Sequence, residues 1–188
     1  MTHPHLTAQC RIDTPLGPMT AVATDKGIAG LWFDEQAHHP GPLDLPVKPD
    51  HRWLKSADAY LRRYFEAEWP AQRSLPLDLH GTPFQRAVWQ ALLALPAGQT
   101  STYAAIAAAA GSPAGVRAAG AAIGRNPISV LVPCHRVVGA DGSLTGYAGG
   151  LERKRALLLH EGVSLSRSLD AKGQLQQTVE LQTHGRNR

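Results

Sequence analysis

Residues 103–124 read YAAIAAAAGSPAGVRAAGAAIG, and this stretch decides how the second half of the chain folds. Alanine has the highest helix propensity, so the two alanine-rich parts predict helices. Between them, Gly-Ser-Pro at 111–113 ends one helix and offers the next a capping serine and a proline for its first turn. We therefore predict helices over about 103–110 and 113–124. Two short helices joined by a tight glycine turn are typical of a helix-turn-helix.

The predicted second helix is unusual, because alanines and glycines leave it almost no side-chain bulk and Arg117 stands out among them. A helix that reads the major groove of DNA normally carries several long polar side chains. One interpretation is a smooth surface that approaches a narrow groove closely and inserts one arginine into the base stack. The other is a helix that packs tightly on its neighbours and leaves Arg117 in solvent. The helix taken alone favours packing.

A strong helix start precedes this region. Thr82 can cap a helix, Pro83 fits the first turn, and Gln85 completes a Thr-x-x-Gln capping box. Apolar residues at helical spacing continue to Leu95, where Pro96-Ala97-Gly98 ends the pattern. The sequence therefore predicts a third helix ahead of the helix-turn-helix.

The first 80 residues show a different pattern. Short alternating segments separated by turn signals predict a β-meander over Ala8–Asp13, Pro18–Thr24 and Ile28–Phe33. Aromatic and leucine residues at helical spacing over 53–65 then predict a helix with an apolar, core-facing side. Leu75–Leu79 is a candidate for one more strand. This part of the sequence indicates no chemistry.

These patterns divide the chain into three parts. Residues 1–80 form an N-terminal α/β domain, and residues 81–162 form a mostly helical C-terminal domain. Residues 163–188 are polar and rich in glutamine, so we expect a flexible tail.

The strongest chemical signal is Pro133-Cys134-His135, which follows the apolar run 128–132. That run predicts a buried strand, and a cysteine followed by a histidine at its end suggests a nucleophile beside a base. The only other cysteine is Cys10, so the sequence does not indicate a disulfide framework. The Cys134 thiol is therefore explained either by core packing or by chemistry.

Composition limits the possibilities. The chain has 188 residues, of which 43% are hydrophobic and 18% charged, as in ordinary globular proteins. Residues 1–80 carry a net charge of −2, whereas residues 81–162 carry +4, which suits a polyanion such as nucleic acid but also a merely basic protein. The sequence shows no signal peptide or membrane span, so we expect a cytoplasmic protein.

Several motifs together carry a family resemblance that none carries alone. The motifs are, in chain order, Tyr103, Arg117-Ala118-Ala119-Gly120, Asn126-Pro127, Pro133-Cys134-His135-Arg136-Val137, Tyr147-Ala148-Gly149-Gly150-Leu151 and His160-Glu161-Gly162. With these motifs in this order, the chain resembles the O6-alkylguanine-DNA alkyltransferases (methylated-DNA–protein-cysteine methyltransferases) of the stand-alone bacterial type. The resemblance implies an α/β (α+β) fold with a ribonuclease-H-like antiparallel sheet and helix, followed by a mostly helical domain with the helix-turn-helix.

The resemblance also implies a reaction. The protein would transfer an alkyl group from O6-alkylguanine, and from O4-alkylthymine, to Cys134 in a single irreversible turnover without a cofactor. In this scheme His135 deprotonates Cys134 through a water, because neighbours on an extended chain point to opposite sides, and its imidazolium depresses the pKa of the thiol. Glu161 orients His135, Asn126 holds the turn and the thiolate, and Tyr103 donates to N3 of the leaving guanine.

The same resemblance assigns the remaining site residues and the partner, which is double-stranded DNA containing alkylated guanine, bound by a monomer. Arg117 would fill the stack after the damaged base is flipped out through the minor groove. The other DNA-binding residues are Ala118, Ala119, Gly120, Thr102, Ser112 and Arg125. The substrate pocket is assigned to Val132, Pro133, Ser129, Tyr147 and Ala148.

The chain departs from the family at positions that bind structural zinc in some members. These positions read His5, Thr24, Ala29 and His80, which is not a full ligand set, so we predict no metal. Ser129 and Ala148 also replace residues found in some members, and both changes bear on the tolerance for bulky alkyl groups. Two other functions stay open: a catalytically silent protein that binds alkylated bases, and a Cys-His-Glu thiol hydrolase.

Overall fold

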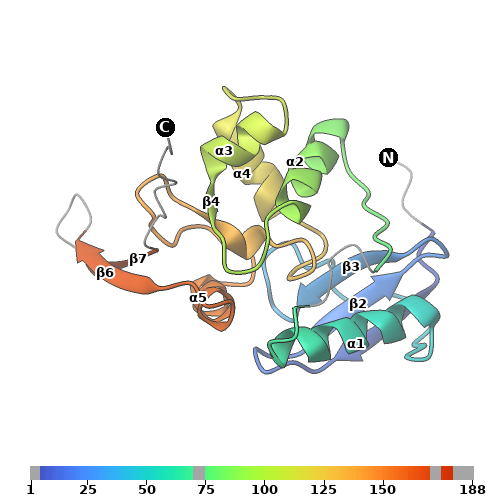
Figure 1. Ribbon diagram of the computed structural model, residues 1–188. Coiled ribbons are helices and arrows are strands. Elements are labelled where there is room, and N and C mark those ends of the chain that lie inside the picture. Colours follow the sequence, from blue (N-terminus) through green and yellow to red (C-terminus); the bar gives the residue numbers. More distant parts are fainter. Residues whose placement is uncertain (1–4, 70–74, 170–174, 180–188) are drawn as a thin grey trace.

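The computed structural model describes residues 5–69, 75–169 and 175–179 (Figure 1). Its N-terminal domain is built on an antiparallel sheet in the order β1-β2-β3. The strands are β1 (Ala8–Ile12), β2 (Met19–Ala23) and β3 (Ile28–Phe33). The predicted meander is therefore confirmed. The turn between β1 and β2 is closed by the Gly17 amide, which donates to the Thr14 carbonyl over 3.0 Å.

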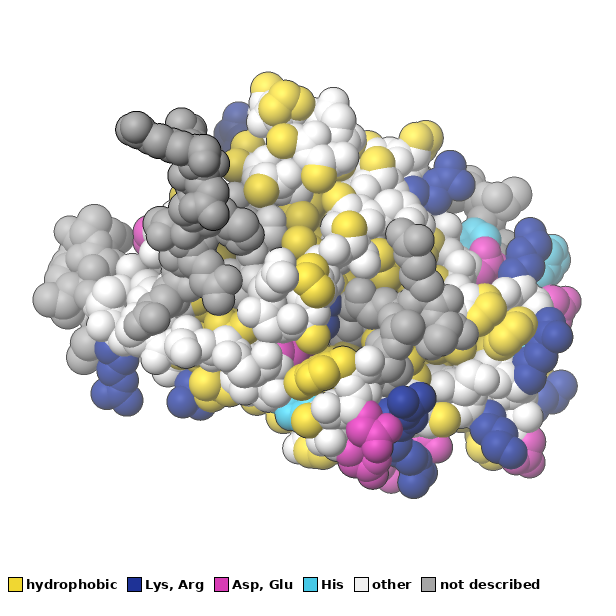
Figure 2. Space-filling view, viewed as in Figure 1, with side chains coloured by type: hydrophobic (Ala, Val, Ile, Leu, Met, Phe, Trp, Pro, Cys, Tyr) yellow, Lys and Arg dark blue, Asp and Glu magenta, His cyan; other side chains and the backbone are white. Residues whose placement is uncertain are grey.

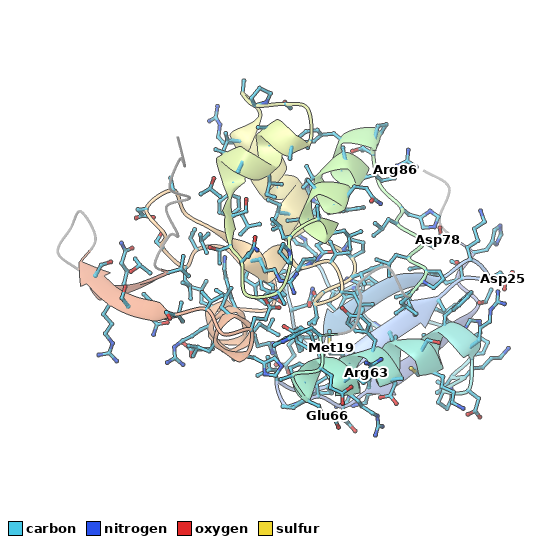
Figure 3. The ribbon with its side chains drawn as sticks, viewed as in Figure 1. Met19, Asp25, Arg63, Glu66, Asp78 and Arg86 are labelled. Atoms are coloured by element: carbon cyan, nitrogen blue, oxygen red, sulfur yellow. The ribbon has the colours of Figure 1, made fainter. Side chains whose placement is uncertain are left out.

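Helix α1 (Arg52–Phe65) packs its apolar side on this sheet, as its spacing predicts. Met19 lies between the sheet and the helix, whereas Arg63 and Glu66 lie on the solvent side (Figure 3). The segment 75–79 forms a single bridge between Leu77 and Ile28 instead of the additional strand that the sequence suggests.

The C-terminal domain begins with α2 (Pro83–Leu93), whose predicted capping box is present. The Thr82 hydroxyl accepts from the Gln85 amide over 3.2 Å, and the Gln85 side chain accepts from the Thr82 amide over 2.9 Å. The elements that follow are β4 (Ser101–Thr102), α3 (Tyr103–Ala109), α4 (Val116–Gly124), the 3-10 turn η2 (Cys134–Arg136), β5 (Val137–Val138) and α5 (Leu151–His160).

Helices α3 and α4 form the predicted helix-turn-helix and pack on α2 (Figure 1). The start predicted for the second helix is wrong. Residues 112–115 form a separate turn, in which the Gly115 amide donates to the Ser112 carbonyl over 2.8 Å. As a result Gly115, not Ser112, precedes the first helical residue, and no side chain caps the helix.

The apolar run 128–132 is a buried turn and not the strand that the sequence predicts. Only Ile128 is bridged, in parallel to Leu31 of β3. The Val132 amide donates back to the Ile128 carbonyl over 3.0 Å, and Val130 adopts a positive φ of 70°. This φ is unfavourable for a β-branched residue, so the surrounding contacts must impose it. The bridge to Leu31 also joins the sheet of the first domain to the segment that leads to Cys134.

The segment after residue 162 differs from the flexible tail that the sequence suggests. Among its described residues, β6 (Leu165–Leu169) and β7 (Leu175–Val179) form an antiparallel hairpin (Figure 1). The hairpin pairs with the loop after β5, because the Val179 amide donates to the Gly142 carbonyl over 2.9 Å and the Leu144 amide to the Gln177 carbonyl over 3.0 Å. Val179 packs with Val138, Leu158 and Val163 in a small separate core.

In the described part of the chain, no helix has the length and apolar character needed to cross a membrane.

We expect a chain that ends at Val163 to unfold more easily than the full chain. Removing the hairpin uncovers the small core beside Val138 and Leu158, at a cost of about 2–4 kcal/mol in the free energy of unfolding. Urea denaturation followed by circular dichroism measures the difference. A chain that ends at Val179 keeps both strands and serves as the control. Equal stability of the Val163 chain and the full chain would show that the hairpin does not stabilise the fold.

Candidate active site

Cys134 begins the 3-10 turn η2 and is 4% exposed. The turn corrects the expectation that Cys134 and His135 are neighbours on an extended chain. Val132 and Pro133, which precede the cysteine, are buried with it. The thiol therefore lies inside the C-terminal domain, close to the buried turn that is bridged to β3.

Asn126 holds both that turn and the thiol. Its side-chain Nδ2 donates to the Val132 carbonyl over 2.7 Å and lies 3.0 Å from Sγ of Cys134. Its Oδ1 accepts from the Ile128 amide over 3.0 Å. One buried amide thus stabilises the strained turn and directs an N–H at the sulfur, an arrangement that favours negative charge there.

His135 and Glu161 meet in the interior with both side chains fully buried. His135 Nε2 lies 2.8 Å from Glu161 Oε1, at the end of α5. The other ring nitrogen, Nδ1, makes no hydrogen bond to a described residue. Because Glu161 binds one ring nitrogen, Nδ1 remains available to exchange a proton.

Arg136 completes the cluster, although sequence reasoning did not assign it a role. Its guanidinium binds Glu161 in bidentate fashion, with Nε 2.8 Å from Oε2 and Nη2 2.7 Å from Oε1. Burial raises the pKa of Glu161, but the hydrogen bonds from His135 and Arg136 outweigh it and hold that pKa far below its usual range. The carboxylate is therefore charged at neutral pH. Arg136 directly follows Cys134-His135 in the sequence, and this position is the signal that could have identified it.

In the free protein, burial favours the neutral forms of both the thiol and the imidazole. Burial raises the pKa of Cys134, and the Asn126 hydrogen bond and the Lys154 ammonium lower it only in part. Burial likewise lowers the pKa of His135 by more than Glu161 raises it. The expected depressed pKa of Cys134 is thus wrong for the free protein, because desolvation opposes both charges of an ion pair.

Lys154 is a second residue that the sequence did not reveal, since lysine is almost never fully buried. It is 0% exposed, and its Nζ donates to the Val137 and Thr145 carbonyls. Burial lowers the pKa of Lys154 to about 8, while Cys134 raises it. The ammonium therefore fastens the loop after β5 and places a positive charge near the thiol.

The predicted pocket residues Tyr147 and Ala148 lie on the continuation of this loop. The ring of Tyr147 lies edge-on to that of His135, with centroids 6.4 Å apart, and Ala148 accepts from the Ala37 amide over 2.9 Å. Tyr103 donates its hydroxyl to the Thr145 carbonyl over 3.0 Å. The structure thus brings these three predicted site residues to one loop near the thiol.

Burial raises the pKa of Tyr147 well above its ordinary value and the Ser129 hydroxyl lowers it in part, so Ser129 lies beside this pocket residue. The Ser129 hydroxyl donates to Oε1 of Gln36, over 3.0 Å, in the N-terminal domain. The residue therefore contributes to the contact between the domains. No described contact links its hydroxyl to the thiol.

The predicted DNA-binding residues lie on α4 and at the ends of the helix-turn-helix: four are on α4, Thr102 directly precedes α3, Ser112 lies in the turn between the helices, and Arg125 directly follows α4. In Figure 2 this upper part of the molecule shows mainly small apolar side chains and backbone, with few charges. Arg117, Ala118 and Arg125 are exposed. Thr102 caps α3, Ser112 is half-buried, and Gly120 packs near the Tyr103 ring. Ala119 does not fit this assignment, because its side chain is fully buried in the core.

Two of the four positions that bind zinc in some alkyltransferases, Thr24 and His80, both contact the carboxylate of Asp78. Asp78, on the segment between the domains (Figure 3), accepts from the Thr24 hydroxyl over 2.6 Å and lies 3.0 Å from His80 Nε2. Within residues 5–69, 75–169 and 175–179 there is no group of three or more His, Cys, Asp or Glu side chains that could hold a metal ion.

Comparison with known proteins gives consistent matches. Residues 83–163 match the family model described as 6-O-methylguanine DNA methyltransferase, DNA binding domain. The chain is 45% identical over 147 residues to the methylated-DNA–protein-cysteine methyltransferase of Mycobacterium tuberculosis H37Rv, covering 78% of this chain and 87% of that protein. The corresponding protein of Salmonella typhimurium is 42% identical over 164 residues, covering 82% and 95%.

Solved structures agree with the sequence matches. The crystal structure of the Mycobacterium tuberculosis O6-methylguanine methyltransferase is 43% identical with a TM-score of 0.73, covering 82% of this chain and 92% of that one. A structure of the Mycobacterium tuberculosis protein in complex with DNA is 42% identical with a TM-score of 0.75 and the same coverage. The methyltransferase of Pyrococcus kodakaraensis is 26% identical with a TM-score of 0.61, covering 83% and 99%.

We expect Cys134 to remain a neutral thiol at neutral pH and to ionise above the ordinary cysteine pKa of about 8.5, because burial outweighs its partners. Because its folded-state pKa is raised, Cys134 contributes fully to the free energy of unfolding below a pH of about 8.5, which is its pKa in the unfolded chain. This contribution is lost as the pH rises through the folded-state pKa. Thiolate absorbance of the native protein minus that of Cys134→Ser isolates this group from Cys10 and the tyrosines. A titration midpoint below about 8.5 would show instead that the pKa of Cys134 is depressed.

Proposed function

The chain belongs to the methylated-DNA–protein-cysteine methyltransferases, which repair DNA by alkyl transfer, and we propose that Cys134 is the residue that accepts the alkyl group. The observation that supports this assignment is the buried cluster itself. A thiol 3.0 Å from the Asn126 amide is followed in the chain by an imidazole whose far nitrogen is held by a buried carboxylate. Cys10, the other cysteine, lies in β1 of the N-terminal domain.

In the proposed reaction the thiol proton passes to Nδ1 of His135 as the substrate enters. The sulfur attacks the alkyl carbon in line, so that a C–S bond forms while the bond from that carbon to O6 breaks. Glu161 and Arg136 remain an ion pair, and Glu161 stabilises the imidazolium. The guanine leaves as an anion and takes up one proton. This proton balances the one that the thiol lost. The thioether has no route to hydrolysis, so each molecule acts once.

Tyr103 is suited to assist the departure of guanine. Burial raises its pKa, and the nearby Cys134 raises it further, so the phenol remains protonated and acts as a donor. Its hydroxyl now donates to the Thr145 carbonyl. On substrate binding we propose that it exchanges this acceptor for N3 of the guanine, where negative charge develops.

Access to the target requires the damaged nucleotide to leave the duplex, at a cost of a few kcal/mol. We propose that α4 approaches the minor groove and that Arg117 fills the vacated stack. Arg117 and Ala118 are exposed on a helix with little side-chain bulk, which permits a close approach. A homologue has been crystallised with DNA, which supports DNA as the partner, and we propose that the DNA is double-stranded. We extend the proposal to a monomeric protein and to O4-alkylthymine as a second substrate.

Cys134→Ser should abolish alkyl transfer while DNA binding persists, because a hydroxyl is a far weaker nucleophile at neutral pH. Transfer of a labelled methyl group from O6-methylguanine DNA to the protein measures the first property, and a gel-shift assay measures the second. Cys10→Ser is the matched control and should transfer normally. A labelled methyl group that maps to Cys10, or transfer by Cys134→Ser, would overturn the assignment.

Arg117→Ala should slow repair of duplex DNA at least tenfold more than transfer from the free modified base, since only the duplex needs its stack filled. Single-turnover rates on both substrates give the ratio. Arg62→Ala removes the same type of side chain from the exposed side of α1 and should leave the ratio unchanged. Equal losses on both substrates would assign Arg117 to folding or catalysis instead.

A further inference from the structure

One side chain from the N-terminal domain reaches the buried cluster. We propose that Tyr64 is a positioning residue of the transfer site. Its hydroxyl fixes the Glu161 carboxylate and weakens the electrostatic attraction between that carboxylate and the ring proton of His135. This inference rests on the proposed function. It assigns a role in the chemistry to a domain whose sequence indicates none.

The Tyr64 hydroxyl binds the same carboxylate oxygen of Glu161 that binds His135. Its Oη donates to Oε1 of Glu161 over 2.7 Å, and the same oxygen binds His135 Nε2 at 2.8 Å. Nη2 of Arg136 reaches that oxygen as well, at 2.7 Å. The other oxygen, Oε2, accepts from Arg136 Nε at 2.8 Å and lies 3.3 Å from the Gly98 amide. Three donors therefore share the negative charge of Oε1.

The ring of Tyr64 is held from several directions. The side chain is 2% exposed, and its ring packs against Phe65, Trp69 and His160 with centroids 5.2, 5.7 and 5.2 Å apart. His160 Nε2 lies 2.6 Å from the Tyr64 carbonyl, which can only accept, so this nitrogen carries the proton. Because His160 directly precedes Glu161, α1 is joined to the end of α5 both by this bond and by the Tyr64 hydroxyl.

The hydroxyl acts only as a donor. Burial raises the pKa of Tyr64 far above its ordinary value, and the Glu161 carboxylate raises it further. A neutral donor on Oε1 withdraws negative charge from the oxygen that stabilises imidazolium. Tyr64 thus helps to keep His135 neutral in the free protein, able to accept the thiol proton when substrate arrives.

Other groups face the same cluster and are unchanged by a substitution at position 64. They are Arg136 of the 3-10 turn, Lys154 and His160 of α5, Tyr60 of α1, and Cys134 and Tyr147 beside the imidazole. Tyr60 provides a matched control. It lies one turn earlier on α1, is 7% exposed, and makes no hydrogen bond to Glu161 in the described structure.

The test compares native protein, Tyr64→Phe and Tyr60→Phe by NMR titration of the His135 ring, whose signal is assigned by its loss in His135→Gln. We expect Tyr64→Phe to move the titration midpoint of His135 upward by about half to one pH unit, because Oε1 loses one donor. The pH profile of the transfer rate should move with it. Tyr60→Phe should leave both where they are.

A second variant covers the case in which Tyr64→Phe folds poorly. Difluorotyrosine at position 64 keeps the ring and donates more strongly, so it should move the His135 midpoint downward. If stability falls but the midpoint stays in place in both variants, Tyr64 is only a structural link between the domains and the proposal is wrong. The midpoint can be read without any transfer, so absence of methyl transfer in the native protein would overturn the proposed function and not this inference.

Discussion

The structure depends on one buried negative charge, the carboxylate of Glu161. It is held by Tyr64 from the first domain, by His135 and Arg136 from the turn that carries the thiol, and by the Gly98 amide. An isolated carboxylate would be far too costly in the interior, so the cluster forms only when all of these segments are in place. The same contacts that join the domains therefore also orient the imidazole.

Under the proposed mechanism, burial of this cluster keeps the thiol and the imidazole neutral until substrate arrives. Burial opposes charge on both Cys134 and His135, while Asn126 and Lys154 favour a thiolate without being able to produce it alone. Proton transfer from thiol to imidazole creates two charges at positions already supplied with partners, Asn126 on one side and Glu161 on the other. Electrostatic preorganisation of this kind needs no rearrangement of the protein at the moment of reaction.

The sequence was informative where local chemistry decides structure. The meander, the capping-box helix and the existence of the helix-turn-helix followed from alternation, capping and turn residues. The turn at 128–132 could not be predicted, because an apolar run suits a buried strand, and the turn is imposed by tertiary contacts with the Asn126 side chain and with β3. The hairpin was missed because its glutamines obscure the alternation that marks a strand.

Only part of the candidate site could be predicted from the sequence. The order of motifs pointed to Cys134, His135 and Glu161, and the fold brings His135 and Glu161 together although they are 26 positions apart in the sequence. Tyr64 resembles any core aromatic on an amphipathic helix, and Lys154 resembles any surface lysine. Their roles come from tertiary contacts with carbonyl and carboxylate oxygens, which no local pattern encodes.

The most direct test of the central role of Glu161 is the pH dependence of the free energy of unfolding in native protein and in Glu161→Gln. The folded-state pKa of Glu161 is depressed, so its contribution is present above the unfolded pKa of about 4.3 and is lost as pH falls toward the folded value. We expect Glu161→Gln to be less stable at neutral pH by about 3–5 kcal/mol, because the Arg136 guanidinium loses its carboxylate and keeps only neutral partners such as the Leu95 carbonyl, and we expect the difference to narrow in acid. Parallel curves with equal stability at neutral pH would contradict it.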